Sequence, residues 1–274
     1  MIETHRSFAN TWECDENKHI NVQFFFKRFE EAREVFVQKT QTNITTGLAT
    51  TRHVRFHKEV HAGDSLKIDS GVIASGDYSG ALAHRMINST NGELCTTALD
   101  FPMHWENVPE FSNTHLGEVI PRGLPSGNIP VLDTDKLLRA GEAMITNYII
   151  LRRHDLDHQG NFLSSRIISM FTDGAPHIWE GAGVHTQWLN KNNFGRVAVE
   201  LNVSTHAKPQ IGNALMLISR VNEIEGRTFR IDHQIETVKD RKAIASGSVR
   251  CLVMDLKARK AVFLPDSLST KLNG

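Results

Sequence analysis

The sequence has little cysteine, and its three cysteines form no pattern. Cys14, Cys95 and Cys251 are far apart and odd in number, which argues against a disulfide framework and against a CxxC metal site. No stretch approaches the length of a membrane span, and the first residues lack the basic region and apolar run of a signal peptide. These absences lead us to expect a reduced, cytoplasmic protein that does not contact a membrane.

An excess of charge is also absent. The 274 residues include 31 Lys and Arg and 31 Asp and Glu, so we expect no general attraction to nucleic acid or to an anionic surface. A hydrophobic content of 40% is ordinary for one large or two small domains with real cores.

The most informative stretch lies directly before a predicted helix. Asp15, Asn17 and His19 place a carboxylate, an amide and an imidazole at every second position. The apolar residues that follow are spaced by three and four, which predicts one helix face: Val22, Phe25, Phe26, Phe29, Ala32 and Phe36. Asn21 is a good N-cap, so the helix should begin near residue 21, and its free N–H groups should stabilise an anion beside the motif.

Predicted strands surround this helix. Residues 5–14 have the composition of a strand, and four more are predicted at 54–60, 65–74, 81–87 and 93–101, separated by turns rich in Gly, Asn and Asp. Closely linked strands of this kind form an antiparallel meander. The predicted fold class is α+β.

A proline-rich stretch follows the last of these strands. Five of the eight prolines lie between Pro102 and Pro130, which is typical of a linker rather than of a packed element. Residues 132–140 favour a short helix. We therefore predict a first domain at 1–104, a Pro/Gly-rich linker at 105–138 and a second domain at 139–274.

The second half repeats the first. A shift of 142 places Asp15 on Asp157, Asn17 on Gln159, His19 on Asn161 and Phe29 on Phe171. Beyond a longer loop near residues 181–195 the shift becomes 149, which pairs His57 with His206, Gly63 with Gly212, Val72 with Val221 and His84 with His233. The chain is predicted to be two copies of one unit, and the matching His84 and His233 indicate a shared packing role.

The motif from Asp15 to Val22, with Phe24 or Phe25 and then Glu31-Ala32-Arg33, resembles the hotdog-fold acyl thioesterases. Its Asp-x-Asn-x-His-hydrophobic-Asn spacing is most similar to the acyl-acyl-carrier-protein (acyl-ACP) thioesterases, which carry two hotdog units in one chain. Residues 153–161 resemble the corresponding region of 4-hydroxybenzoyl-CoA-type thioesterases. The resemblance implies two tandem hotdog domains, each a long helix wrapped by an antiparallel sheet, that hydrolyse an acyl-CoA or acyl-ACP thioester without metal or cofactor.

The resemblance also implies roles for four residues. Asp15 would attack the thioester or act as general base on water, and the sequence leaves both open. Asn17 would orient the water or the carboxylate, His19 would donate a hydrogen bond or shuttle a proton, and Glu59, on the strand after the helix, would position the water or His19. The second repeat departs from this set with Gln159, Asn161 and Lys208, and in the acyl-ACP family the full set lies in the later repeat.

Substrate contacts are expected from both repeats, because acyl groups in this fold enter between the two units. The N–H groups of Ile20, Asn21 and Val22 would form the oxyanion site, and Phe25 would face both the core and the acyl pocket. The second repeat would shape the pocket through Asp157 and Asn161.

Each assignment has a structural alternative. Asp15 and Asn17 could merely close their own turn, His19 could be an ordinary surface histidine, and Glu59 could lie on an exposed strand. A metal site at His154, Asp155, Asp157 and His158 is disfavoured because neighbours on one short segment point to different sides. Cys14 is better explained as a small buried hydrophobe than as a nucleophile.

Two other functions stay open. A hotdog enoyl-CoA hydratase also uses an Asp and a His near the helix start, but with a gap of five residues and a Pro between them, whereas here the gap is four and no Pro is present. A non-catalytic acyl-thioester-binding protein is the other alternative. The sequence leaves open whether the chain forms a homo-oligomer.

Overall fold

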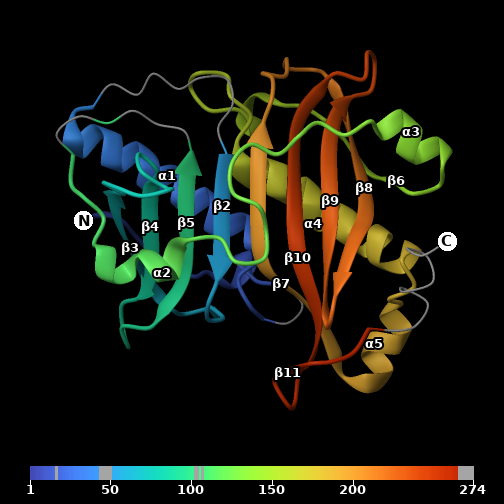
Figure 1. The fold of residues 1–274 in the computed structure, drawn as a ribbon, viewed down its shortest axis with the longest axis horizontal. Helices are drawn as coiled ribbons and strands as arrows, with labels where there is room; N and C mark the ends of the chain where they lie inside the picture. Colours follow the sequence, from blue (N-terminus) through green and yellow to red (C-terminus); the bar gives the residue numbers. More distant parts are fainter. Residues whose placement is uncertain (16–17, 43–50, 102–104, 106–107, 265–274) are drawn as a thin grey trace.

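The structure, a computed structural model, describes residues 1–15, 18–42, 51–101, 105 and 108–264. These residues form one continuous sheet of eleven strands with the two long helices on the same face (Figure 1). The first half comprises β1 (Ile2–Phe8), α1 (Val22–Thr40), β2 (Thr51–Phe56), β3 (Ser65–Val72), β4 (Leu82–Asn88) and β5 (Leu94–Phe101). The second comprises β6 (Met144–Ile150), α4 (Ser164–Gly181), α5 (Thr186–Asn192), β7 (Phe194–Thr205), β8 (Ala214–Glu225), β9 (Thr228–Thr237), β10 (Ala243–Asp255) and β11 (Lys260–Ala261).

The strand order confirms the internal repeat. The first half is ordered β1-β3-β4-β5-β2 and the second β6-β8-β9-β10-β7, and β2 pairs with β7 to join them edge to edge. At the centre of this seam His53 pairs with Asn202. Because 202 − 53 = 149, this pair reproduces the sequence shift that aligns the later parts of the two halves. Each half is a helix wrapped by an antiparallel sheet, as the resemblance implies.

Helix α1 begins where the sequence predicts. The Asn21 side chain accepts a hydrogen bond from the backbone N–H of Gln23 at 3.2 Å, so it is the N-cap. The predicted apolar face is buried from Phe25 onward, with Phe26, Phe29 and Phe36 fully inaccessible, and Val22 at its start is half-buried. This face packs on the sheet, and α1 also lies against α4 (Figure 1).

The matching histidines have the same structural role in both halves. His84 Nδ1 lies 2.6 Å from Ser70 Oγ, and His233 Nδ1 lies 2.7 Å from Ser219 Oγ. Both imidazoles are buried, and burial lowers the pKa of His233 to about 3. This histidine is therefore neutral at neutral pH, and the predicted packing role is confirmed.

Three predicted elements are wrong in extent or type. The first strand ends at Phe8, because the buried Glu13 carboxylate accepts from the Asn10 N–H and turns residues 11–13 into a 3-10 helix. The strand predicted at 54–60 is β2, which ends at Phe56, so Glu59 is not on a strand. The predicted loop near 181–195 contains α5. The short helix expected within 132–140 is present as α3 (Thr134–Arg139).

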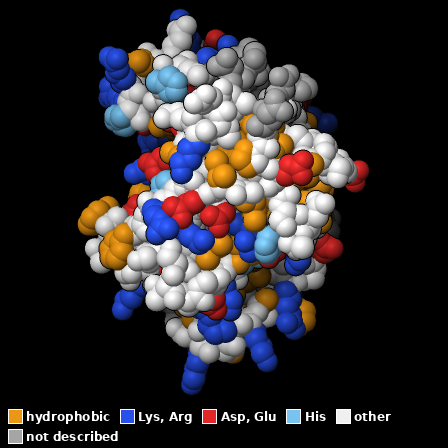
Figure 2. All heavy atoms as spheres, turned by 90° about the vertical axis from the view of Figure 1, so that its left-hand side faces the viewer, with side chains coloured by type: hydrophobic (Ala, Val, Ile, Leu, Met, Phe, Trp, Pro, Cys, Tyr) orange, Lys and Arg blue, Asp and Glu red, His pale blue; other side chains and the backbone are white. Residues whose placement is uncertain are grey.

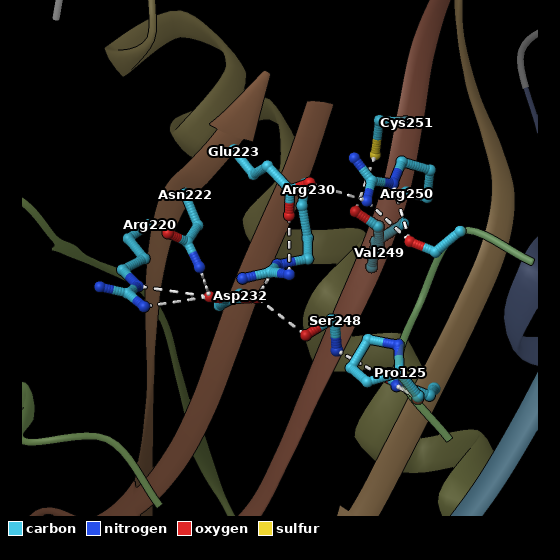
Figure 3. A network of polar contacts seen from close by, with 12 residues as sticks. Pro125, Arg220, Asn222, Glu223, Arg230, Asp232, Ser248, Val249, Arg250 and Cys251 are labelled. Atoms are coloured by element: carbon cyan, nitrogen blue, oxygen red, sulfur yellow. Dashed lines mark hydrogen bonds and ion pairs between the residues drawn. The ribbon is translucent and has the colours of Figure 1, made fainter. Parts of the chain in front are cut away.

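Between β5 and β6, residues 108–143 are described as one stretch, and they pack on the sheet, contrary to the expectation of an unpacked linker. It includes the short helix α2 (Leu116–Val119), and it crosses the face opposite the long helices (Figure 1). Its main-chain carbonyls accept hydrogen bonds from outward-facing side chains of both halves, because Arg55 donates to the Ile120 carbonyl at 2.9 Å and Arg250 to the Gly123 carbonyl at 2.7 Å. Figure 3 shows Arg250 within a wider polar network on β8, β9 and β10. Through these hydrogen bonds the segment connects the first half with the second.

None of the described helices is long and apolar enough to cross a membrane. On the side of the molecule beside β1, basic and acidic side chains are interspersed (Figure 2), as the balanced composition leads one to expect.

Candidate active site

A cavity of about 620 Å³ lies at the seam between the two halves. The first half contributes Asp15, His19, Val22, Phe25 and residues 56–61 to its lining, and the second contributes residues 196–199, Met254, Leu256 and Arg259. The volume is in the range of small-molecule sites, and the lining combines apolar with charged side chains. The cavity therefore has the size and chemistry to bind a ligand between the repeats.

Asp15 is held at this cavity by its own turn. Cys14 and Ile20 form an isolated bridge, and the Asp15 N–H donates to the His19 carbonyl at 2.8 Å. The Asp15 carboxylate accepts from the backbone N–H of His19 at 3.2 Å. Asp15 thus has the turn-closing role of the structural alternative and also lines the cavity. Asn17 lies outside the described residues.

His19 and Glu59 meet at the cavity wall. His19 Nε2 lies 3.4 Å from Glu59 Oε2, and the His19 ring meets the His61 ring edge to face at a centroid distance of 4.8 Å. Glu59 reaches this position from the segment after β2, which is fixed by a hydrogen bond of 2.9 Å from the Ile20 N–H to the Val60 carbonyl. The predicted partnership of His19 with Glu59 is a contact in the structure.

The same group has potential metal ligands. One atom from each of His19, Glu59 and His61 lies within 4.8 Å of the others, and imidazole and carboxylate are ordinary zinc ligands. However, the Arg259 guanidinium contacts Glu59 Oε2, the oxygen that faces His19. A cation at this point would have to displace the guanidinium.

The N–H groups at the start of α1 are only partly available. The Ile20 N–H donates to Val60, and the Asn21 N–H donates to the Glu13 carbonyl at 2.8 Å. The Val22 N–H has no acceptor among the residues that the structure describes, and Val22 lines the cavity. The expected oxyanion site of three N–H groups is thus reduced to the first N–H of the helix, where the helix dipole also favours negative charge.

In the second repeat, the carboxylate that corresponds to Asp15 makes its hydrogen bonds within its own turn. Both oxygens of Asp157 accept hydrogen bonds from Asn161, one from the backbone N–H at 2.8 Å and one from the side-chain amide at 2.7 Å. Lys208, at the position of Glu59, donates to the Gln159 carbonyl at 3.0 Å. Asp157 and Asn161 do not line the cavity described above.

The free N–H groups at the amino end of α4 also have an acceptor within the protein. Glu30 of α1 accepts hydrogen bonds from the backbone N–H groups of Ser164 and Ser165. The residue that corresponds to Glu30 in the second repeat is Thr172, whose hydroxyl donates to the Ile168 carbonyl of its own helix. A carboxylate therefore occupies one helix end, while the corresponding end of α1 faces the cavity.

The motif turn carries backbone strain that its counterpart avoids. Lys18 has φ +65°, and the residue at the same place in the second repeat is Gly160, with φ +77°. Left-handed backbone is unfavourable for residues with a Cβ and is readily adopted by glycine.

We expect Lys18→Gly to raise the free energy of unfolding by about 1 kcal/mol, measured by denaturant titration. Lys27→Gly, in the interior of α1, is the control and should lower it by about 1 kcal/mol; a destabilised Lys18→Gly would contradict the argument.

Sequence reasoning missed the contributions of the second half to the cavity. Met254, Leu256 and Arg259 lie at the end of β10 and in the turn after it. No motif marks them, and among the described residues the first repeat has no strand that corresponds to β11, so the repeat alignment does not point to them either.

Comparison with known proteins agrees with this architecture. The sequence model of the Thioesterase-like superfamily matches residues 9–108 and 151–272. Among solved structures, the chain is similar to an acyl-ACP thioesterase from Bacteroides thetaiotaomicron, with a TM-score of 0.60 and 10% identity over 90% of this chain and 96% of the other. It is also similar to the 12:0-ACP thioesterase from Umbellularia californica, with a TM-score of 0.56 and 11% identity over 90% and 92%. No curated protein sequence matches the chain. At these identities the structural likeness establishes the fold.

Proposed function

Because the chain belongs to the thioesterase-like superfamily, we propose that it hydrolyses acyl thioesters of coenzyme A or acyl carrier protein to a free acid and a thiol. One observation supports this most: Asp15, His19 and Glu59 line one cavity beside the open amino end of α1. A base, a proton carrier and an anion-stabilising helix end are the groups that acyl transfer to water requires.

The groups can act as follows. With Asp15 as general base, the carboxylate accepts a proton from water while the water oxygen bonds to the thioester carbon, and the carbonyl oxygen becomes negative near the Val22 N–H. The carbon–sulfur bond then breaks, and the departing thiolate takes up the proton that Asp15 accepted, which regenerates the carboxylate. With Asp15 as nucleophile, its carboxylate oxygen bonds to the thioester carbon and the thiolate leaves, which forms an acyl-carboxylate intermediate; water then hydrolyses this intermediate, and the proton released goes to the thiolate. Both routes consume one water and give one acid and one thiol.

The rest of the cavity suits an acyl chain. Phe25 and Phe56 form part of its lining from the first half, and Val197 and Val199 of β7 form part from the second. We propose that Ile20, Val22 and Phe25 contact the acyl thioester directly. Asn21 acts through its cap on the helix, because its side-chain oxygen accepts from Gln23 and its N–H donates to Glu13.

Thiol release tests the proposal directly. The protein is incubated with short, long and aromatic acyl-CoAs and with acyl-ACPs, and free thiol is measured together with free acid. We expect the two products in equal amounts from at least one substrate. A hydratase would change enoyl absorbance without releasing thiol, and a binding protein would take up the thioester and do neither, so thiol release from no substrate would overturn the proposed function.

A further inference from the structure

The turn between β10 and β11 is an addition to the second repeat that reaches the first repeat's site. Strand β10 extends beyond β9 and returns as β11, with Met254 paired to Ala261 and Asp255 to Lys260. The Asp255 side chain accepts hydrogen bonds from the backbone N–H groups that follow it, at 2.9 Å from Lys257 and 2.8 Å from Ala258. An Asp that closes its own turn in this way fixes the backbone conformation of the turn.

The turn is held against the seam by a close approach to β7. A Cβ on Gly195 would lie 2.7 Å from Leu256 Cδ2, so the absence of a side chain at Gly195 lets Leu256 lie on the strand. Leu256 and Met254 then form part of the cavity wall. Arg259, with φ +56°, leaves the turn toward the first repeat and contacts Glu59 Oε2.

Arg259 and His19 therefore share one carboxylate oxygen. His19 Nε2 lies 3.4 Å from the same Oε2. The Glu59 side chain is about one third exposed, at 31%, and without a partner a glutamate at such a site samples several rotamers. An arginine from a fixed turn selects the rotamer in which Oε2 faces the imidazole.

We propose that Arg259 is a positioning residue for thioester hydrolysis: it holds Glu59 so that Glu59 orients His19 in the cavity. This inference rests on the proposed function. It makes the site a composite of both repeats, in which the first repeat supplies the reacting groups and the second supplies the cation that sets their geometry. Small displacements of reacting groups cost large factors in rate, so the effect is expected on kcat.

Arg259→Gly is the appropriate variant, because glycine adopts a positive φ without strain and the turn should persist. We expect kcat for thiol release to fall about 10- to 100-fold with little change in KM, and added guanidinium to restore part of it. The loss should be equal for an acyl-CoA and for the matching acyl-N-acetylcysteamine thioester, which has no phosphate. Lys257→Ala, in the same turn, should behave as wild type.

Two kinetic outcomes would overturn the proposal. A loss confined to the acyl-CoA, expressed in KM, would show that Arg259 binds substrate phosphate. An unchanged kcat in Arg259→Gly would show that the contact with Glu59 has no part in the reaction.

A measurement without turnover separates this proposal from the proposed function. The His19 imidazole signals, identified in NMR spectra by their loss in His19→Gln, should shift in Arg259→Gly as they do in Glu59→Gln and stay in place in Lys257→Ala. An unmoved His19 signal in Arg259→Gly overturns the positioning role even in an active enzyme. A shifted signal in a protein that releases no thiol upholds the coupling of Arg259 to His19 and overturns the proposed reaction instead.

Discussion

Asp15→Asn should leave a folded protein whose thiol release is slower by about 100- to 10,000-fold. The amide oxygen can still accept the hydrogen bond from the His19 N–H, which the Asp15 carboxylate accepts at 3.2 Å, so the turn should survive. The amide can neither take a proton from water nor attack the thioester, so both catalytic routes are lost. The measurement is kcat/KM for the best substrate, with circular dichroism and the thermal midpoint as checks on folding.

Asp157→Asn is the matched control, since the sequence shift and the turn geometry place Asp157 where Asp15 lies in the first repeat. Its carboxylate is occupied by Asn161 within the turn and lies outside the cavity lining. We expect wild-type kcat/KM for this variant. Loss of activity in Asp157→Asn alone would move the chemistry to the second repeat, and an active, folded Asp15→Asn would refute the assigned role of Asp15.

Much of the fold follows from sequence because its signals are local or repeated. The spacing of Phe25, Phe26 and Phe29 and the cap at Asn21 fix α1 by interactions within a few turns of chain. The shift of 149 carries long-range information: two copies of one unit, joined edge to edge about a two-fold axis, must pair equivalent residues at the centre. His53 opposite Asn202 is that pair.

The site could be predicted only in part, because several of its contacts join distant segments. The proximity of Asp15 and His19 is local, since they share one turn. The Ile20 N–H is unavailable for substrate because it donates to the Val60 carbonyl, and this contact depends on where the chain returns after β2. The contact of Arg259 with Glu59 joins residues 200 positions apart across the seam. No residue type or spacing in either segment predicts this contact.

The two helix ends explain in physical terms why only one repeat is poised to bind an anion. At α4, Glu30 supplies the negative charge that the N–H groups and dipole favour. The buried Arg52 interacts electrostatically with this carboxylate. Its guanidinium also donates to Ser164 Oγ at 3.1 Å and forms two hydrogen bonds of 2.6 Å with Asp100. At the corresponding positions of the second repeat the facing pair is Leu201 and Val249. The buried ion pair of Arg52 and Asp100 in the first repeat is thus replaced by an apolar pair at the equivalent position of the second.

Asp100→Val should lower the free energy of unfolding by about 3–5 kcal/mol, the usual cost of stranding one member of a buried ion pair. Arg52 and Asp100 are only 4% and 3% exposed, so water cannot replace the lost carboxylate. The double variant Arg52→Leu with Asp100→Val installs the pair that the second repeat uses at the same register positions. It should be more stable than Asp100→Val alone, since no unpaired arginine remains. Denaturant titration measures all three proteins.

The pH dependence supplies a second test of the same pair. Burial alone would raise the pKa of Asp100, but the guanidinium of Arg52, with a smaller contribution from His84, holds this pKa far below its ordinary value. A carboxyl group with a lowered pKa in the folded state stabilises the protein above its unfolded pKa of about 3.9, and this stability is lost as the pH falls below that value. Wild-type stability should therefore decline more steeply below about pH 4 than that of the double variant. Equal slopes of stability against pH in the two proteins would mean that protonation of Asp100 does not remove its stabilising effect. In the denaturant titration, a double variant less stable than Asp100→Val would mean that the apolar pair cannot pack beside α1.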